Sequence, residues 1–172
     1  METIRLVPAV FDISFDREST GNEKYEREYI TLESDDDAMT HWFRNANSRG
    51  ETGDTDPVVL NFMLELYRKL DRIEQLLTQN TPHREPLGYK GKIESIGFDH
   101  FKLNEPMLSS GEKYYGRLEL PTYPKREIAL YFEAVDTDVA KIARIHSRDE
   151  DEWGTYMRSR ERAMIRHLKG NE

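Results

Sequence analysis

Apolar residues between positions 57 and 79 recur in alternating steps of four and three, which is the strongest constraint in the chain. The members of this seam take heptad position d (Val59, Leu66 and Ile73) or heptad position a (Met63, Leu70 and Leu77). Asp56 can serve as an N-cap and Pro57 suits the first turn, so the pattern predicts one helix over 57–79 that ends before Pro82. An amphipathic helix this apolar needs a partner for its seam.

Two partners suit that helix. It can associate with other copies of the chain, and leucine at position a with isoleucine at position d favours a tetramer over a dimer. Alternatively, the single helix packs on its own domain, or on a second helix that we predict over 34–47. We expect self-association, through all six seam residues, because the spacing is regular.

The composition narrows the class of protein. The chain has 172 residues, 34% of them charged, a formal net charge of -8 and no cysteine. An acidic chain has little general attraction for nucleic acid, and the absence of cysteine excludes disulfides and thiolate metal sites. The start, METIRLVPAVFDISFD, lacks the pattern of a secretory signal, and no window has the roughly 20 apolar residues of a membrane span. We therefore expect a cytoplasmic protein.

The seam helix separates two unlike parts of the chain. Residues 1–47 predict a short, separate α/β module, with strand patterns over 3–16, a loop over 17–28, a short strand around Ile30 and Leu32, and the helix over 34–47. Residues 48–56 contain no apolar side chain and predict a linker. The later strand patterns lie near 88–95, 98–103, 112–120, 126–135 and 139–146, and a helix follows from near Glu152. Short strands at this spacing predict a small antiparallel barrel.

The order of predicted strands, turns and final helix over residues 86–169 resembles that of a PilZ domain. The stretches that carry the resemblance are ESIGF, GEKYYGRLELP, REIALYFEAV, AKIARIHS and WGTYMRSRERAMIR, and the helix YRKLDRIEQLLTQ resembles that of a divergent PilZ subgroup with a long heptad helix. The resemblance implies a six-stranded antiparallel barrel over 84–172, closed by a C-terminal helix. It also implies bacterial regulation of motility, pili, surface attachment or virulence, and many family members bind cyclic di-GMP.

Ligand-binding members of that family resemble one another at R-x-x-x-R and at D/N-x-S-x-x-G. Glu94-Ser95-Ile96-Gly97 places the glycine one residue too early, and Ile93 stands where Asp or Asn belongs, so a hydrogen bond to guanine is lost. We interpret this stretch as a β-turn with Gly97 at positive φ.

The arginines of the first motif are also displaced. Arg68 and Arg72 have the spacing but lie in the seam helix, and Arg84 lies in the stretch before the barrel. We expect no cyclic di-GMP binding. The alternative is a receptor with a degenerate site, drawn from Arg68, Arg72, Arg84, Glu94, Ser95 and Gly97.

No other motif indicates chemistry. The five histidines show no metal-ligand spacing, and G-x-S-x-G, P-loop and G-x-G-x-x-G sequences are absent, so we expect no enzyme activity, no metal and no cofactor. Arg158, Arg162 and Arg166 form a basic strip on the last helix, either as a solvated face or as a docking strip for an acidic partner protein. The sequence thus predicts a non-enzymatic regulatory adaptor that self-assembles and binds a partner protein. A purely structural subunit of a larger assembly is a third reading, and the partner and pathway are not identified.

Overall fold

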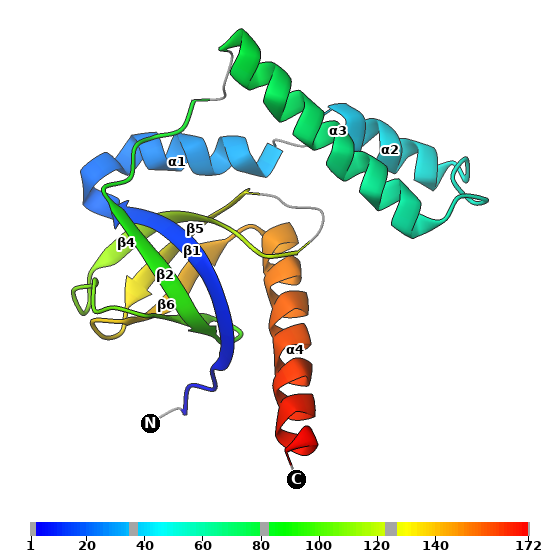
Figure 1. The fold of residues 1–172 in the computed structure, drawn as a ribbon. Helices are drawn as coiled ribbons and strands as arrows, with labels where there is room; N and C mark the ends of the chain where they lie inside the picture. Colours follow the sequence, from blue (N-terminus) through cyan, green and yellow to red (C-terminus); the bar gives the residue numbers. More distant parts are fainter. Residues whose placement is uncertain (1–2, 35–37, 80–82, 123–126, 172) are drawn as a thin grey trace.

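The structure, a computed structural model, describes residues 3–34, 38–79, 83–122 and 127–171. Within these ranges the chain forms a closed antiparallel barrel of six strands, together with four helices (Figure 1). The strands are β1 Val7–Arg17, β2 Tyr89–Ile96, β3 His100–Leu103, β4 Lys113–Glu119, β5 Glu127–Ala134 and β6 Val139–Ile145. The helices are α1 Glu18–Ser34, α2 Ala38–Ser48, α3 Pro57–Thr78 and α4 Ser147–Gly170. Of the predicted class, mainly β with α and a small six-stranded antiparallel barrel, the closed barrel and its accompanying helices are confirmed, although more of the described residues lie in helices than in strands.

β1 closes the barrel, although three helices separate it from β2 in the sequence. The strand order is β1-β2-β3-β6-β5-β4, and β1 pairs with both β2 and β4. Alternate residues of β1 point inward and are buried: Val7, Ala9, Phe11, Ile13 and Phe15. The prediction of a separate N-terminal module over 1–47 is therefore wrong, as is a barrel confined to 84–172. A period-two pattern identifies a strand but not its partner. Here the backbone groups at the free edges of β2 and β4 find hydrogen-bond partners only when β1 pairs with both strands.

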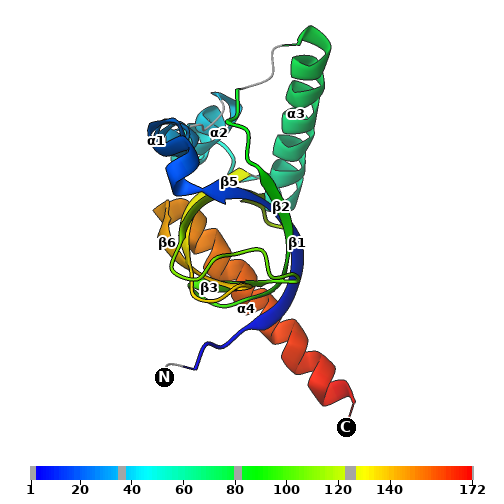
Figure 2. The same ribbon diagram turned by 90° about the vertical axis from the view of Figure 1, so that its left-hand side faces the viewer.

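α4 runs across one end of the barrel (Figure 2) and packs against β1. Trp153 and Met157 of α4 are buried in the barrel core. The Trp153 ring packs edge-on against the rings of Phe11 and Phe101, with distances between ring centres of 6.2 and 6.4 Å. The helix begins at Ser147, several residues before the predicted start near Glu152. These contacts make α4 a part of the barrel fold.

α1 covers a second apolar layer on the outside of the barrel. Its buried residues Tyr25, Tyr29 and Leu32 pack with Tyr115, Ala129 and Tyr131 of β4 and β5. Both faces of β5 are consequently buried, which explains its unbroken apolar run from Ile128 to Phe132. The predictions of a loop over 17–28 and of a strand near Ile30 and Leu32 are wrong. Tyr25, Tyr29 and Leu32 have helical spacing, but the rest of the segment is mostly polar or charged, so the apolar stripe is narrow.

α2 and α3 follow α1 and are joined by a turn. The turn contains Gly50 at a φ of 77°, and the amide of Glu51 donates to the carbonyl of Ala46 at 3.0 Å. The segment over 48–56, predicted to be a linker, is thus the connection of a helical hairpin. In both Figure 1 and Figure 2, α3 lies beyond the barrel, on the side opposite to the C-terminal end of α4.

Candidate functional site

α3 presents a continuous apolar face to solvent. The residues of this exposed face are between 45% and 79% exposed and comprise Val59, Phe62, Met63, Leu66, Leu70, Ile73, Leu76 and Leu77. Leu64 and Glu65 of the same helix are buried. The heptad seam does not pack on the barrel. Soluble monomers rarely expose a contiguous apolar patch of this size, so the face is the strongest candidate for an interaction site.

Local interactions form α3 without help from the barrel. Asp56 is the N-cap, and its Oδ1 accepts a hydrogen bond from the amide of Val58 at 2.9 Å, while Pro57 occupies the first helical position, as the sequence predicts. The helix ends at Thr78, and the C-cap residue Gln79 has a φ of 56° and a left-handed conformation. Both ends of α3 are thus set by local contacts rather than by contacts to the barrel.

The predicted seam residues all lie on this face, and two further residues widen it. Phe62 and Leu76 occupy heptad position g on the same side of the helix, and both are exposed. Phe62 is expected from the sequence to extend the apolar surface. Leu76 is missed there, although it lies two heptads beyond Phe62, at the same position g.

The predicted β-turn over 94–97 is wrong, because Glu94, Ser95 and Ile96 continue β2 and the tight turn follows them, from Gly97 to His100. The amide of Gly97 donates to the carbonyl of His100 at 2.7 Å, and the indole Nε1 of Trp153 donates to the carbonyl of Gly97 at 2.8 Å. Among the described residues, the glycines with positive φ are Gly50 and Gly111, so the predicted positive φ at Gly97 is wrong. A Cβ at Gly97 would lie 2.7 Å from the carbonyl oxygen of Arg5. Close approach of the N-terminal segment therefore requires the glycine.

The structure does not bring the candidate nucleotide-site residues together. Arg84 lies before β2, at the opposite end of that strand from Gly97, and its Nε donates to Glu127 Oε1 at 2.9 Å. Arg68 and Arg72 lie on α3, away from the barrel (Figure 1). Glu94 is paired with Lys102 at 3.0 Å, and Ser95 lies within the β2 ladder opposite Lys102 of β3. These groups thus occupy three separate regions of the described structure.

A buried carboxylate attaches α1 to the barrel, and sequence reasoning misses it. The side chain of Glu28 is 6% exposed and accepts hydrogen bonds from Tyr115 Oη at 2.6 Å, Arg117 Nη1 at 2.8 Å and the amide of Glu85 at 2.9 Å. Desolvation, reinforced by the hydrogen bond to Glu28, raises the pKa of Tyr115. The partners are dispersed in sequence, so no local pattern could reveal the cluster.

A second group of contacts fixes the outer part of α1. Arg144 Nη1 lies 2.8 Å from Glu26 Oε2, and its guanidinium lies 4.4 Å from the centre of the Tyr29 ring. Burial raises the pKa of Tyr29 to about 12, against a smaller opposing effect of Arg144. The imidazole of His146 stacks on the same ring at 3.8 Å and its Nε2 lies 2.8 Å from the carbonyl oxygen of Tyr29. These groups are satisfied structurally and show no nucleophile or base directed at an open cavity.

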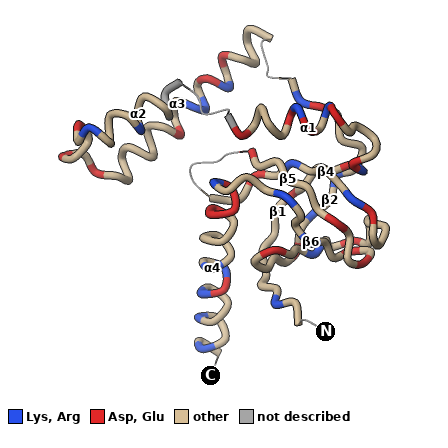
Figure 3. The backbone as a smooth tube through the Cα atoms, turned by 180° about the vertical axis from the view of Figure 1, so that it is seen from behind, with Lys and Arg blue, Asp and Glu red and all other residues tan. Residues whose placement is uncertain are grey.

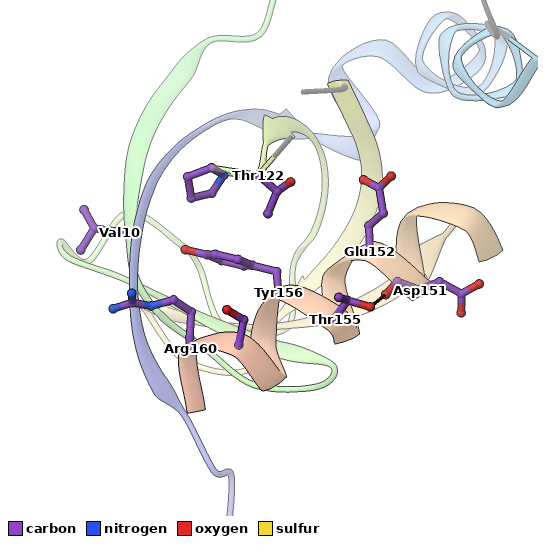
Figure 4. Close-up of a pocket in the computed structure, with 9 residues that line it drawn as sticks. Val10, Thr122, Asp151, Glu152, Thr155, Tyr156 and Arg160 are labelled. Carbon is purple, nitrogen blue, oxygen red and sulfur yellow. Dashed lines mark hydrogen bonds between the residues drawn. The ribbon is translucent and has the colours of Figure 1, made fainter. Parts of the chain in front are cut away.

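An open cleft of about 830 Å³ separates α4 from Val10 of β1 and from Pro121 and Thr122 (Figure 4). Its α4 wall combines acidic and basic ends, with Asp151 and Glu152 before Tyr156 and Arg160. The Nε of Arg160 donates to the carbonyl of Pro8 at 2.9 Å, so its guanidinium also links α4 to β1. None of the residues named as candidates from the sequence lines this cleft.

Arg158, Arg162 and Arg166, the basic strip, lie on the exposed side of α4. Figure 3 shows acidic residues near the beginning of α4 and lysine and arginine predominating towards its C-terminal end. The three arginines of the strip follow one another at intervals of four residues, so their side chains share one helix face. The helix therefore has a structural side, carrying Trp153 and Arg160, and a charged side directed to solvent.

Among the described residues, no three His, Asp or Glu side chains are grouped so as to hold a metal ion. None of the helices in the described ranges is both long enough and apolar enough to traverse a lipid bilayer. No family model, curated protein or solved structure matches the chain.

Proposed function

We propose that this protein is a non-enzymatic regulatory adaptor of PilZ type, which self-assembles through the exposed face of α3 and binds a partner protein. The observation that carries the proposal is the exposed face itself, with its eight large apolar side chains on one helix. The closed antiparallel barrel followed by α4 supports the PilZ type. That type implies a role in bacterial motility, pilus function, surface attachment or virulence.

The size of the apolar face suits self-assembly. Full burial of one large apolar side chain contributes about 1.5 to 3 kcal/mol, so residues that start half to three-quarters exposed contribute about 1 to 2 kcal/mol each. The whole face then supplies roughly 8 to 16 kcal/mol per helix. Association costs about 4 to 15 kcal/mol, so most of the face must be buried for a stable assembly. Loss of two central seam residues is expected to dissociate it.

The identity of the seam residues favours four copies. Leu70 and Leu77 at position a and Ile73 at position d favour more than two strands, because these side-chain shapes fill the wider core of a tetramer. A bundle of α3 helices beyond the barrels leaves the barrel surfaces and α4 accessible to a partner protein. The adaptor thus combines an assembly element and a presentation element in one chain.

The test is the mass of the protein in solution. Sedimentation velocity and light scattering should give an oligomeric mass, with a tetramer expected, for the unaltered chain. The double substitution Leu70→Gln/Ile73→Gln should give a monomer, and glutamine preserves helix propensity, so circular dichroism should remain unchanged. Arg72→Gln is the matched control, since Arg72 is exposed on α3 outside the seam. A monomeric unaltered protein at tens of micromolar, or a double variant that keeps its oligomeric mass, would overturn the proposal.

A further inference from the structure

Among the described residues, the contacts of the basic strip on α4 stay within its own helix. Arg158 contacts Thr155 Oγ1 at 3.3 Å, and Arg162 Nε lies 3.4 Å from the carbonyl oxygen of Arg158, so both contacts stay within α4. No described residue forms an ion pair with any of the three arginines of the strip. By contrast, Glu161 on the same helix is paired with Arg5 at 2.6 Å.

The strip is accompanied by apolar surface. Ile165 is exposed, and it lines a shallow groove of about 480 Å³ with Ser159, Arg162 and Arg166. The C-terminal part of α4 extends past the barrel (Figures 1 and 2), where Leu168 is also exposed. The surface thus offers a row of cations about 12 Å long, at 1.5 Å of helix rise per residue, beside a short apolar border.

We infer that the basic strip of α4 docks an acidic, amphipathic helix of a partner protein. A helix with carboxylates at every fourth position matches the spacing of the three arginines, and a neighbouring apolar residue fits beside Ile165. Arginine suits this role because its planar guanidinium binds carboxylates in a bidentate manner. This inference rests on the proposed adaptor function and names the chemistry of the partner and its docking site.

The charge and shape of the protein favour a partner helix over two other occupants of the basic strip, an anionic membrane and a second copy of this chain. An anionic membrane would meet the whole chain, whose net charge of -8 opposes approach, and a helix that lies in a membrane needs a broader apolar face than Ile165 and Leu168 provide. A second copy of the chain is accounted for by the exposed face of α3, on the opposite side of the barrel. A single acidic helix needs only the local cationic surface.

The test uses the full chain and a labelled synthetic helical peptide, with glutamate at every fourth position and leucine beside each glutamate. Fluorescence anisotropy at low salt should show saturable binding that weakens as the salt concentration rises. A twin peptide with glutamine in place of glutamate should bind much more weakly. Arg162→Glu/Arg166→Glu should weaken binding of the glutamate peptide by roughly tenfold or more, because it replaces attraction with repulsion.

The matched control is Lys24→Glu/Lys90→Glu, which changes the net charge equally on α1 and β2 and should retain peptide binding. No binding of the glutamate peptide, or equal losses in the control and the α4 variant, would overturn the inference. Binding to vesicles of anionic phospholipid without binding to the peptide would also overturn it, in favour of a membrane. A change in oligomeric mass in the α4 variant would do the same, in favour of a second copy.

The assembly variant separates this inference from the proposed function. Leu70→Gln/Ile73→Gln should become monomeric and still bind the peptide with an unchanged affinity per protomer, because the basic strip lies on the C-terminal half of α4, which runs away from α3. If the unaltered protein is monomeric but binds the peptide, the assembly proposal fails and the docking site stands. If the protein assembles but the peptide does not bind, the docking inference alone fails.

Discussion

Replacing Glu28 by alanine should destabilise the fold strongly, because this carboxylate joins α1 to the barrel. The substitution leaves the hydroxyl of Tyr115 and the amide of Glu85 without their acceptor. Arg117, whose side chain is 14% exposed, keeps only a longer contact of 3.4 Å to Glu127. Removing one partner of a buried pair costs about 3 to 5 kcal/mol, and we expect about 3 kcal/mol because Arg117 retains that second carboxylate.

Urea unfolding provides the measurement, carried out in the Leu70→Gln/Ile73→Gln background so that self-assembly does not alter the apparent stability. With a slope of about 3 kcal/mol per molar urea, the midpoint should fall by about 1 M. Glu23→Ala is the matched control on the same helix, because Glu23 is exposed and forms only a long ion pair with Arg27, at 3.7 Å. This substitution should change the free energy of unfolding by less than about 0.5 kcal/mol. Similar midpoints for the Glu28 and Glu23 variants would refute the assigned role of Glu28.

Three further outcomes are expected. Gly97→Ala should destabilise the protein by about 1 to 3 kcal/mol, because its Cβ would lie 2.7 Å from a backbone carbonyl oxygen, whereas Gly170→Ala, with open space around it, should be nearly neutral in the same urea assay. Burial raises the pKa of Tyr29 from 10.0 to about 12 and also raises the pKa of Tyr115, so the folded state holds both protons more tightly than the unfolded state does. This contribution to folding stability is complete below pH 10 and should decline as the pH rises towards 12. The urea midpoint should therefore fall less steeply with rising pH in Tyr115→Phe than in the protein that keeps Tyr115. Calorimetric titration with cyclic di-GMP should give no binding heat up to high-micromolar ligand, and low-micromolar binding lost in Arg84→Ala would instead support a receptor.

The strands illustrate the extent and the limit of prediction. Alternation of apolar residues locates β2 to β6 within a few residues, and it also marks strand character in residues 3–16. It cannot show that β1 pairs with β2 and β4, because pairing across three intervening helices depends on side chains that meet only in the folded barrel. The N-terminal segment is therefore assigned to a separate module from its sequence, although it completes the sheet.

Gly97 and Arg84 show the same limit at the candidate sites. A glycine in a turn suggests positive φ, but Gly97 is required by the nearby carbonyl of Arg5, which is distant in sequence. Arg84 suggests a phosphate ligand, but Glu127 accepts its hydrogen bond. In both cases the deciding neighbour comes from another element, so no spacing rule could identify it.

The sequence alone determines the features that arise within one helix or strand: the N-cap and apolar seam of α3, the strip of Arg158, Arg162 and Arg166, and most of the barrel strands. Tertiary structure decides which of these surfaces remain free. It buries Tyr25 and Tyr29 of a highly charged segment, pairs Glu28 with Arg117, and leaves the seam of α3 in solvent. The physical reason is that capping and periodicity act over a few residues, whereas burial and charge pairing depend on elements brought together only when the barrel closes.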